Sequence, residues 1–187
     1  MGDSSMMIAD ANLTTWLIWL AVLVVSGSLS FIYSGLEIGI YAMNKIRLDL
    51  RAESGSKTAR VIRRLISNQR NFLAVLMIGN NVVNYASTFA VSTMFWLAGY
   101  GDQAEWYAMA VATPLLFIFC ESIPKSVAQR AAERFVYRFV GVLRISSLLF
   151  NAVGLAPLVK GFAAMLIRLM GLKRRGYVPM GHEGLAA

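Results

Sequence analysis

Long apolar stretches alternate with short polar and basic stretches along this chain of 187 residues. The apolar stretches cover about residues 13–43, 72–97 and 106–123. A helix that crosses the hydrocarbon core of a bilayer needs roughly 20 predominantly apolar residues, and each stretch is long enough to do so. The pattern therefore predicts an all-α membrane protein with three transmembrane helices, in a single membrane domain over residues 13–175.

The segments between and after these stretches predict shorter helices. Residues 44–70 are helix-prone on both sides of the turn signal ESGSK, so we expect two short helices there. Residues 125–172 predict amphipathic juxtamembrane helices that lie at the membrane surface. The part from 139 to 170 is apolar enough for a fourth crossing, but basic residues recur through it and Pro157 interrupts it. The surface arrangement is the preferred interpretation, and the fourth crossing remains the alternative.

The distribution of charge predicts the orientation. The net charge is +8, and all 18 Lys and Arg residues fall within 45–70, 125–144 and 160–175. Basic residues accumulate on the cytoplasmic side of membrane proteins, which places the N-terminus outside and the C-terminus inside. Residues 1–12 then form an extracellular tail. We expect a multi-pass protein of the plasma membrane, or of the inner membrane in a bacterium, with membrane lipid rather than nucleic acid as its partner.

Polar side chains recur within the apolar stretches at helical spacing. They are Ser26, Ser30, Ser34 and Glu37 in the first, Asn80, Asn84, Ser87 and Thr88 in the second, and Thr113 and Glu121 in the third. Spacings of three, four and, in the third set, eight residues place each set on one helical face, and the three faces are expected to meet. Hydroxyl, amide and carboxylate oxygens suit Mg²⁺, Ca²⁺ or Na⁺ better than zinc or copper.

Simpler interpretations compete with an ion site. A serine in a membrane helix often bonds the carbonyl four residues earlier, and an asparagine often joins two helices. Glu121 is also one turn from Lys125 and is placed to pair with it. An enzyme is not expected, because the only histidine, His182, lies in the C-terminal tail.

Three motifs give the chain a family resemblance. The segments SFIYSGLEIGIYAM, IGNNVVN and CESIPKS follow one another in the order and spacing of the transmembrane domain of the CNNM/CorC family. The resemblance covers about residues 15–170. These cyclin-M-like and CorC-like proteins are magnesium transporters, so the resemblance implies three spans with a cytoplasmic helical belt, a homodimer, and Mg²⁺ export thought to be coupled to Na⁺.

The resemblance also implies a set of metal-site residues: Ser30, Ser34, Asn80, Asn84, Glu121, Gly35, Cys120 and Glu37. The serines match the paired serines of the first span, and the asparagines match those of the family's GN-x-x-VN pattern. Glu121 matches the acidic residue of its G-E-x-x-P-K segment. Cys120 departs from that pattern, because glycine usually precedes the glutamate.

The expected function is therefore Na⁺-coupled Mg²⁺ export across the membrane. The alternative is a membrane-embedded Mg²⁺ sensor or scaffold that regulates another transporter and carries no flux itself, and a passive channel also stays open. Residues 176–187 are expected to be a linker stub, and the CBS-pair domains that usually follow in the family are absent from this sequence.

Overall fold

The structure is a computed structural model that describes residues 2–152, 154 and 161. Every regular element in that part of the chain is helical, which confirms the predicted all-α class there. The α-helices are α1 (Gly2–Ala42), α2 (Lys45–Glu53), α3 (Lys57–Ser67), α4 (Gln69–Phe95), α5 (Ala104–Leu116), α6 (Ile123–Arg130) and α7 (Ala132–Ala152). Three irregular helical turns link them: Trp96–Tyr100, Gly101–Gln103 and Phe117–Ser122.

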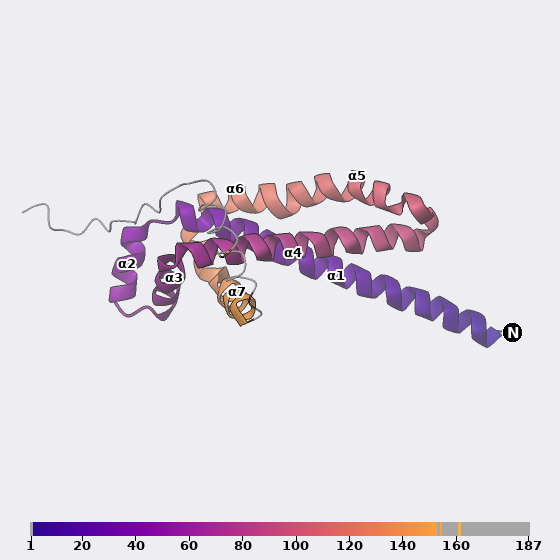
Figure 1. Cartoon of the computed structure of the whole chain (residues 1–187), viewed down its shortest axis with the longest axis horizontal. Coiled ribbons are helices and arrows are strands. Elements are labelled where there is room, and N and C mark those ends of the chain that lie inside the picture. The colour runs from indigo at the N-terminus through magenta and orange to yellow at the C-terminus, as the bar shows by residue number, and fades with distance from the viewer. Residues whose placement is uncertain (1, 153, 155–160, 162–187) are drawn as a thin grey trace, which may run out of the picture.

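Three long helical legs run lengthwise through the molecule, and α1 is inclined to the other two (Figure 1). The first leg is α1, the second is α4, and the third is the continuous run of α5, the Phe117–Ser122 turn and α6. The chain reverses between the second and third legs at Gly99 and Gly101, whose φ angles of 93° and 52° favour glycine.

Two ranges, Leu13–Ala42 and Phe72–Arg130, are long and apolar enough to cross a membrane. The second range contains the reversal and so supplies both the second and the third leg. Three legs match the predicted pattern, whereas the passage of all three through a bilayer stays a prediction.

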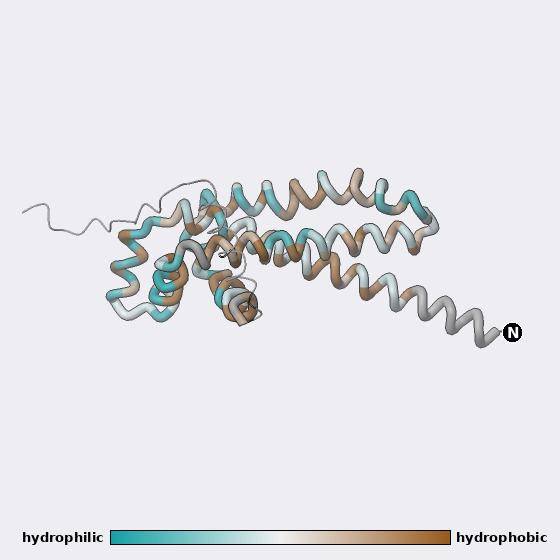
Figure 2. The backbone as a smooth tube through the Cα atoms, viewed as in Figure 1, coloured by the Kyte–Doolittle hydropathy of each residue, from teal (hydrophilic) through white to brown (hydrophobic). Residues whose placement is uncertain are grey.

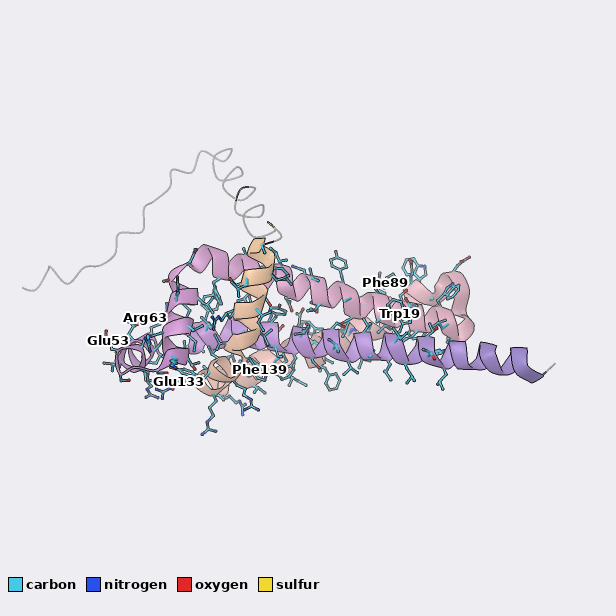
Figure 3. All side chains as sticks on the ribbon, turned by 90° about the horizontal axis from the view of Figure 1, so that it is seen from below. Trp19, Glu53, Arg63, Phe89, Glu133 and Phe139 are labelled. Carbon is cyan, nitrogen blue, oxygen red and sulfur yellow. The ribbon has the colours of Figure 1, made fainter. Side chains whose placement is uncertain are left out.

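The outer surface of the legs is apolar and the short helices are polar. Large apolar side chains such as Val24, Tyr85 and Phe117 are exposed along the legs, as expected for surfaces that face lipid. Figure 2 shows hydrophilic residues gathered on α2, α3 and α6 and near the reversal. Trp19 and Phe89 pair on α1 and α4 with ring centroids 5.3 Å apart, in the half of the legs away from α2 and α3 (Figure 3).

The buried core lies at the end of the molecule that carries the short helices. Leu36 of α1, Ile62 of α3, Val75 of α4 and Leu143 of α7 are almost fully buried in one cluster. Burial of such a side chain contributes roughly 1.5–3 kcal/mol in water. This cluster therefore holds the short helices and α7 onto the legs.

The two short helices predicted within 44–70 are present, and each has its own cap. The Asn44 side chain accepts a hydrogen bond from the Arg47 amide at 3.1 Å, and the Ser56 side chain accepts one from the Ala59 amide at 3.3 Å. Such caps satisfy amides at a helix start that have no partner within the helix. The turn between the helices contains Gly55, whose φ is 97°.

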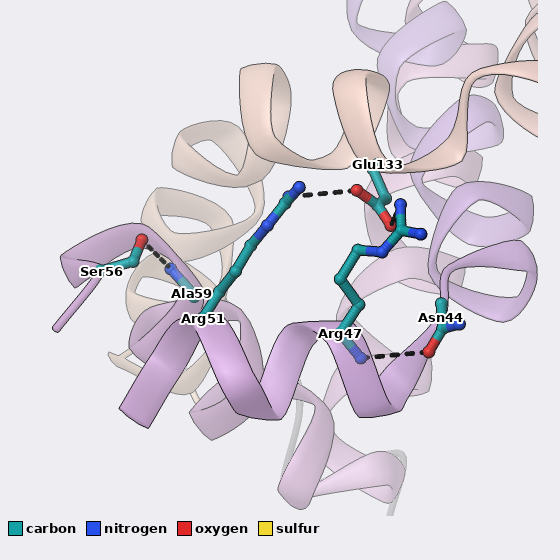
Figure 4. Close-up of polar contacts among 6 residues, drawn as sticks. All are labelled: Asn44, Arg47, Arg51, Ser56, Ala59 and Glu133. Atoms are coloured by element: carbon teal, nitrogen blue, oxygen red, sulfur yellow. Dashed lines mark hydrogen bonds and ion pairs between the residues drawn. The ribbon is translucent and has the colours of Figure 1, made fainter. Parts of the chain in front are cut away.

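An ion-pair cluster ties α2 to α7. Glu133 at the start of α7 accepts from Arg47 at 3.2 Å and from Arg51 at 3.1 Å (Figure 4). The Arg51 guanidinium also lies over the Tyr137 ring, 5.4 Å from its centre. Both arginines of α2 therefore have partners on α7.

The ends of the predicted segments differ in detail from the structure. Helix α1 begins at Gly2, so the expected tail of residues 1–12 is helical from residue 2. The chain bends at Ala131 (φ −131°, ψ 42°), and α7 then runs crosswise to the legs (Figures 1 and 3). A crosswise α7 agrees with the preferred surface arrangement as far as Ala152. The rest of the predicted 125–172 helices and the 176–187 stub lie outside the described residues, apart from 154 and 161.

Candidate metal site

The polar faces of the first two legs meet at Ser30. The Ser30 hydroxyl lies 2.6 Å from Oδ1 of Asn84 and 3.2 Å from Oδ1 of Asn80, and it donates toward both amide oxygens. Ser30 is fully buried. Because the asparagines are four residues apart on α4, both side chains reach the same point on α1.

The third leg joins this network through Glu121. The Nδ2 group of Asn84 donates to Oε1 of Glu121 at 3.3 Å. Asn84 thus bridges α1 and the Phe117–Ser122 turn, since its oxygen accepts from Ser30 and its nitrogen donates to the carboxylate. The predicted convergence of Ser30, Asn80, Asn84 and Glu121 is therefore present in the structure.

Ser34 is one helical turn from Ser30 and has a different environment. It is 1% exposed, and its hydroxyl has no hydrogen-bond partner in the part of the chain that the structure describes. A buried polar atom without a partner is rare and costs about 1–3 kcal/mol. Ser34 lies one helical turn from Ser30, so this hydroxyl is a candidate ligand for an added cation.

Two other buried serines, Ser26 and Ser87, form the usual hydrogen bonds of serines in membrane helices, unlike Ser30. Ser26 bonds the Val22 carbonyl at 2.7 Å and Ser87 bonds the Val83 carbonyl at 3.0 Å, and their hydroxyls meet at 2.7 Å. These two serines join α1 to α4 and form a helix contact of the simpler kind. Ser30 instead makes its bonds to the α4 asparagines.

Other polar residues of the predicted stripes lie away from the network. Thr88 and Thr113 are exposed. Asn81 is also exposed, and its amide bonds the Met77 carbonyl of its own helix at 2.8 Å. Within the described residues, Lys125 forms no ion pair, so the alternative pairing with Glu121 is not seen there.

Glu121 and Cys120 lie in a π-helical turn, Phe117–Ser122, between two prolines of the third leg. A proline lacks the amide that would bond the carbonyl four residues earlier, and for Pro124 that carbonyl belongs to Cys120. Wide turns of this kind are frequent at functional sites. Cys120 is buried, and its Sγ lies 3.7 Å from the place where a Cβ on Gly27 would stand, so the thiol packs on α1.

Gly35 and Glu37 have surroundings of their own. A Cβ added to Gly35 would stand 2.2 Å from the Phe135 ring of α7, so this position packs α1 against α7. Glu37 is half-buried and has no hydrogen bond or ion pair with any described residue. Neither residue joins the Ser30 network, and their role as ligands stays a prediction.

Sequence reasoning missed one residue that positions the site. A Cβ added to Gly79 would stand 2.6 Å from the Tyr33 ring. The Tyr33 hydroxyl is hydrogen-bonded to the hydroxyl of Ser146 on α7. Tyr33 thus fixes α4 against both α1 and α7 next to Asn80. The signal was the glycine before the asparagines, because a small residue in a membrane helix permits close approach of a neighbour.

The donor set is made of oxygen. Among the described residues, no group of three or more His, Cys, Asp or Glu side chains is placed to hold a metal. The cluster offers hydroxyl and amide oxygens with one carboxylate, Glu121. This set excludes a zinc centre of the usual type at this place and suits a hard cation such as Mg²⁺ or Na⁺.

Comparison with known proteins agrees with the motifs. Residues 19–182 match the family model described as the cyclin M transmembrane N-terminal domain, CNNM. A UPF0053 protein of Haemophilus influenzae is 32% identical over 152 residues, which is 81% of this chain and 36% of that protein. The UPF0053 inner membrane protein YfjD of Escherichia coli is 31% identical over 145 residues, 78% of this chain and 33% of that protein.

A yeast relative extends the comparison to eukaryotes. Protein MAM3 of Saccharomyces cerevisiae is 30% identical over 130 residues, 67% of this chain and 17% of that protein. The chain spans about a third or less of the length of these curated relatives. An all-helical fold with exposed apolar legs and an inner membrane relative identify a membrane protein. With a matching family model over most of its length, the chain belongs to the cyclin M (CNNM) transmembrane N-terminal domain family.

Proposed function

We propose that this chain is the membrane domain of a Mg²⁺ transporter, and that Mg²⁺ is bound as its substrate between α1, α4 and the Phe117–Ser122 turn. The observation that carries the proposal is the buried network of Ser30, Asn84 and Glu121 with the partnerless Ser34 hydroxyl beside it. Helix packing alone gives no reason for a buried serine hydroxyl without a bond, because such groups normally find a partner.

The chemistry of Mg²⁺ supports this assignment. Mg²⁺ takes about six oxygen ligands near 2.1 Å and gives up its waters reluctantly. The side-chain oxygens of Ser30, Ser34, Asn80 and Asn84 replace some of these waters, and the Glu121 carboxylate offsets part of the double charge. The remaining ligands are waters of the ion.

The proposed direction of transport rests on the orientation that the basic end of the molecule indicates and on the Mg²⁺ export that the family resemblance implies. With α2, α3 and α6 in the cytoplasm, Ser34 lies about 12 Å from the cytoplasmic end of α1 at Ala42, at 1.5 Å per residue. Mg²⁺ then enters from the cytoplasm and leaves after an outward rearrangement, and Na⁺ moving down its gradient drives the cycle. The transporter works as a homodimer in the plasma membrane, or in the inner membrane of a bacterium, with three spans per chain. It catalyses no covalent reaction.

A binding experiment tests the site. Asn84→Ala removes the bridge between Ser30 and Glu121 and is expected to weaken Mg²⁺ binding at least tenfold by calorimetry in detergent, about 1.4 kcal/mol. Asn81→Ala is the matched control, because Asn81 is exposed and bonds only its own helix. Equal Mg²⁺ affinity in the two variants contradicts the proposed site.

A flux experiment separates a transporter from a sensor. The purified protein in liposomes, with Mg²⁺ on one side and a Na⁺ gradient imposed, is expected to move Mg²⁺ in proportion to that gradient. Mg²⁺ binding without flux identifies a sensor that uses the same residues. Flux that ignores Na⁺ identifies a channel.

A further inference from the structure

An open groove lies between α3 and α7, away from the oxygen network. Its volume is about 410 Å³, and Arg64 of α3 and Arg144 of α7 stand among its walls. Val61, Leu65 and Leu148 provide an apolar part of the lining. The groove therefore joins two cationic side chains from separate helices to an apolar surface.

The two arginines differ from those of α2. Arg47 and Arg51 are both paired with Glu133. Neither Arg64 nor Arg144 forms an ion pair in the part of the chain that the structure describes. Two guanidinium groups on one groove, neither paired with a carboxylate of the described residues, attract an anion, and their planar donors suit phosphate oxygens.

The position of the groove along the legs sets the kind of anion. Asn68, which also lines the groove, directly precedes α4, and the apolar range of that leg starts at Phe72, about 6 Å further along the helix. The groove therefore lies at the level where a bilayer has its headgroups. On α7, Ile145, Leu148 and Leu149 follow Arg144 and are exposed by 68%, 66% and 56%. These apolar side chains are available to the acyl chains that begin below the headgroups.

We propose that this groove binds one anionic phospholipid, with the phosphate between Arg64 and Arg144 and the start of an acyl chain along Leu148. A free phosphate carries at least as much negative charge but gains nothing from the apolar wall. A zwitterionic lipid has the same chains but no net charge. The groove is thus expected to prefer a ligand that has both features, which would dock α7 and α3 on the inner leaflet.

The test uses the detergent-purified chain and native mass spectrometry, with dihexanoyl phosphatidylglycerol, dihexanoyl phosphatidylcholine and pyrophosphate as separate probes. Phosphatidylglycerol is expected to bind best. Arg64→Gln and Arg144→Gln should each weaken it about fivefold. Leu148→Gln should weaken the lipid and leave pyrophosphate binding unchanged.

Arg134→Gln is the matched control, because Arg134 is an exposed arginine of α7 that does not line the groove. It should leave lipid binding unchanged, and thermal melting should show that all variants fold. An equal loss with Arg134→Gln overturns the proposal in favour of diffuse surface charge. Equal binding of the two lipids overturns it as well, and so does a pyrophosphate affinity that matches phosphatidylglycerol and ignores Leu148.

Discussion

Gly79→Ala tests whether Tyr33 fixes the second leg against the first. The new Cβ would stand 2.6 Å from two atoms of the Tyr33 ring and 3.0 Å from its oxygen, whereas ordinary contact begins at 3.4 Å. The ring cannot simply swing away, because Tyr33 is buried and its hydroxyl is bonded to Ser146 on α7. Relief therefore requires α1 and α4 to separate or the Tyr33–Ser146 bond to break.

The size of the effect follows from these contacts. Overpacking of this kind costs about 1–3 kcal/mol, and loss of the Tyr33–Ser146 bond adds roughly 0.5–1.5 kcal/mol. Alanine gains up to about 1 kcal/mol over glycine in helix propensity. The net loss of stability is expected to be about 1–3 kcal/mol, together with weaker Mg²⁺ binding, because Asn80 follows Gly79 directly.

Unfolding in mixed detergent, followed by far-UV circular dichroism, measures the loss. Gly141→Ala is the control, because nothing lies within 4 Å of a Cβ at that helical glycine, and it should cost nothing. In a Tyr33→Leu background the Gly79→Ala penalty should shrink by at least about 1 kcal/mol. A Gly79→Ala protein as stable as the parent, or a penalty independent of residue 33, would refute the reasoning.

Three further predictions concern other contacts. Glu121→Gln keeps the shape but removes the charge, so Mg²⁺ affinity by calorimetry should fall at least tenfold, about 1.4 kcal/mol; an unchanged affinity would exclude Glu121 as a ligand. A double-mutant cycle with Ser26→Ala and Ser87→Ala should give a coupling near 0.6 kcal/mol in thermal stability, and zero coupling would contradict their bond. Glu133→Gln loses two partly exposed ion pairs, so stability should fall by about 0.5–1 kcal/mol and the loss should shrink in high salt; a loss independent of salt would point to packing instead.

The sequence predicted the meeting of Ser30, Asn80, Asn84 and Glu121 because helical spacing fixes which residues share a face. Polar side chains in a membrane-spanning helix are costly when they face lipid, so the polar faces of the three helices are expected to face one another. Helical spacing also places Asn81, the neighbour of Asn80 in sequence, on a different face of α4. Asn81 is exposed and bonds only its own helix. The two helices within 44–70 were also predictable, because their turn and cap residues act locally.

Other features depend on contacts that spacing does not encode. Gly35 belongs to the same motif as Ser34, but its lack of a side chain leaves room for the Phe135 ring of α7. No pattern in the first leg reveals that partner. Helix α1 continues back to Gly2 through a polar segment, where apolar periodicity gives no signal.

The double role of the Asn84 amide has a consequence for the proposed cation site. Its oxygen accepts from α1 and its nitrogen donates to the third leg, so the proposed ligands Ser30, Asn84 and Glu121 are bonded to one another before a cation arrives. An arriving cation must exchange those bonds for its own, which moderates its affinity. In the transport cycle proposed above, an affinity limited in this way favours release of the ion over its storage.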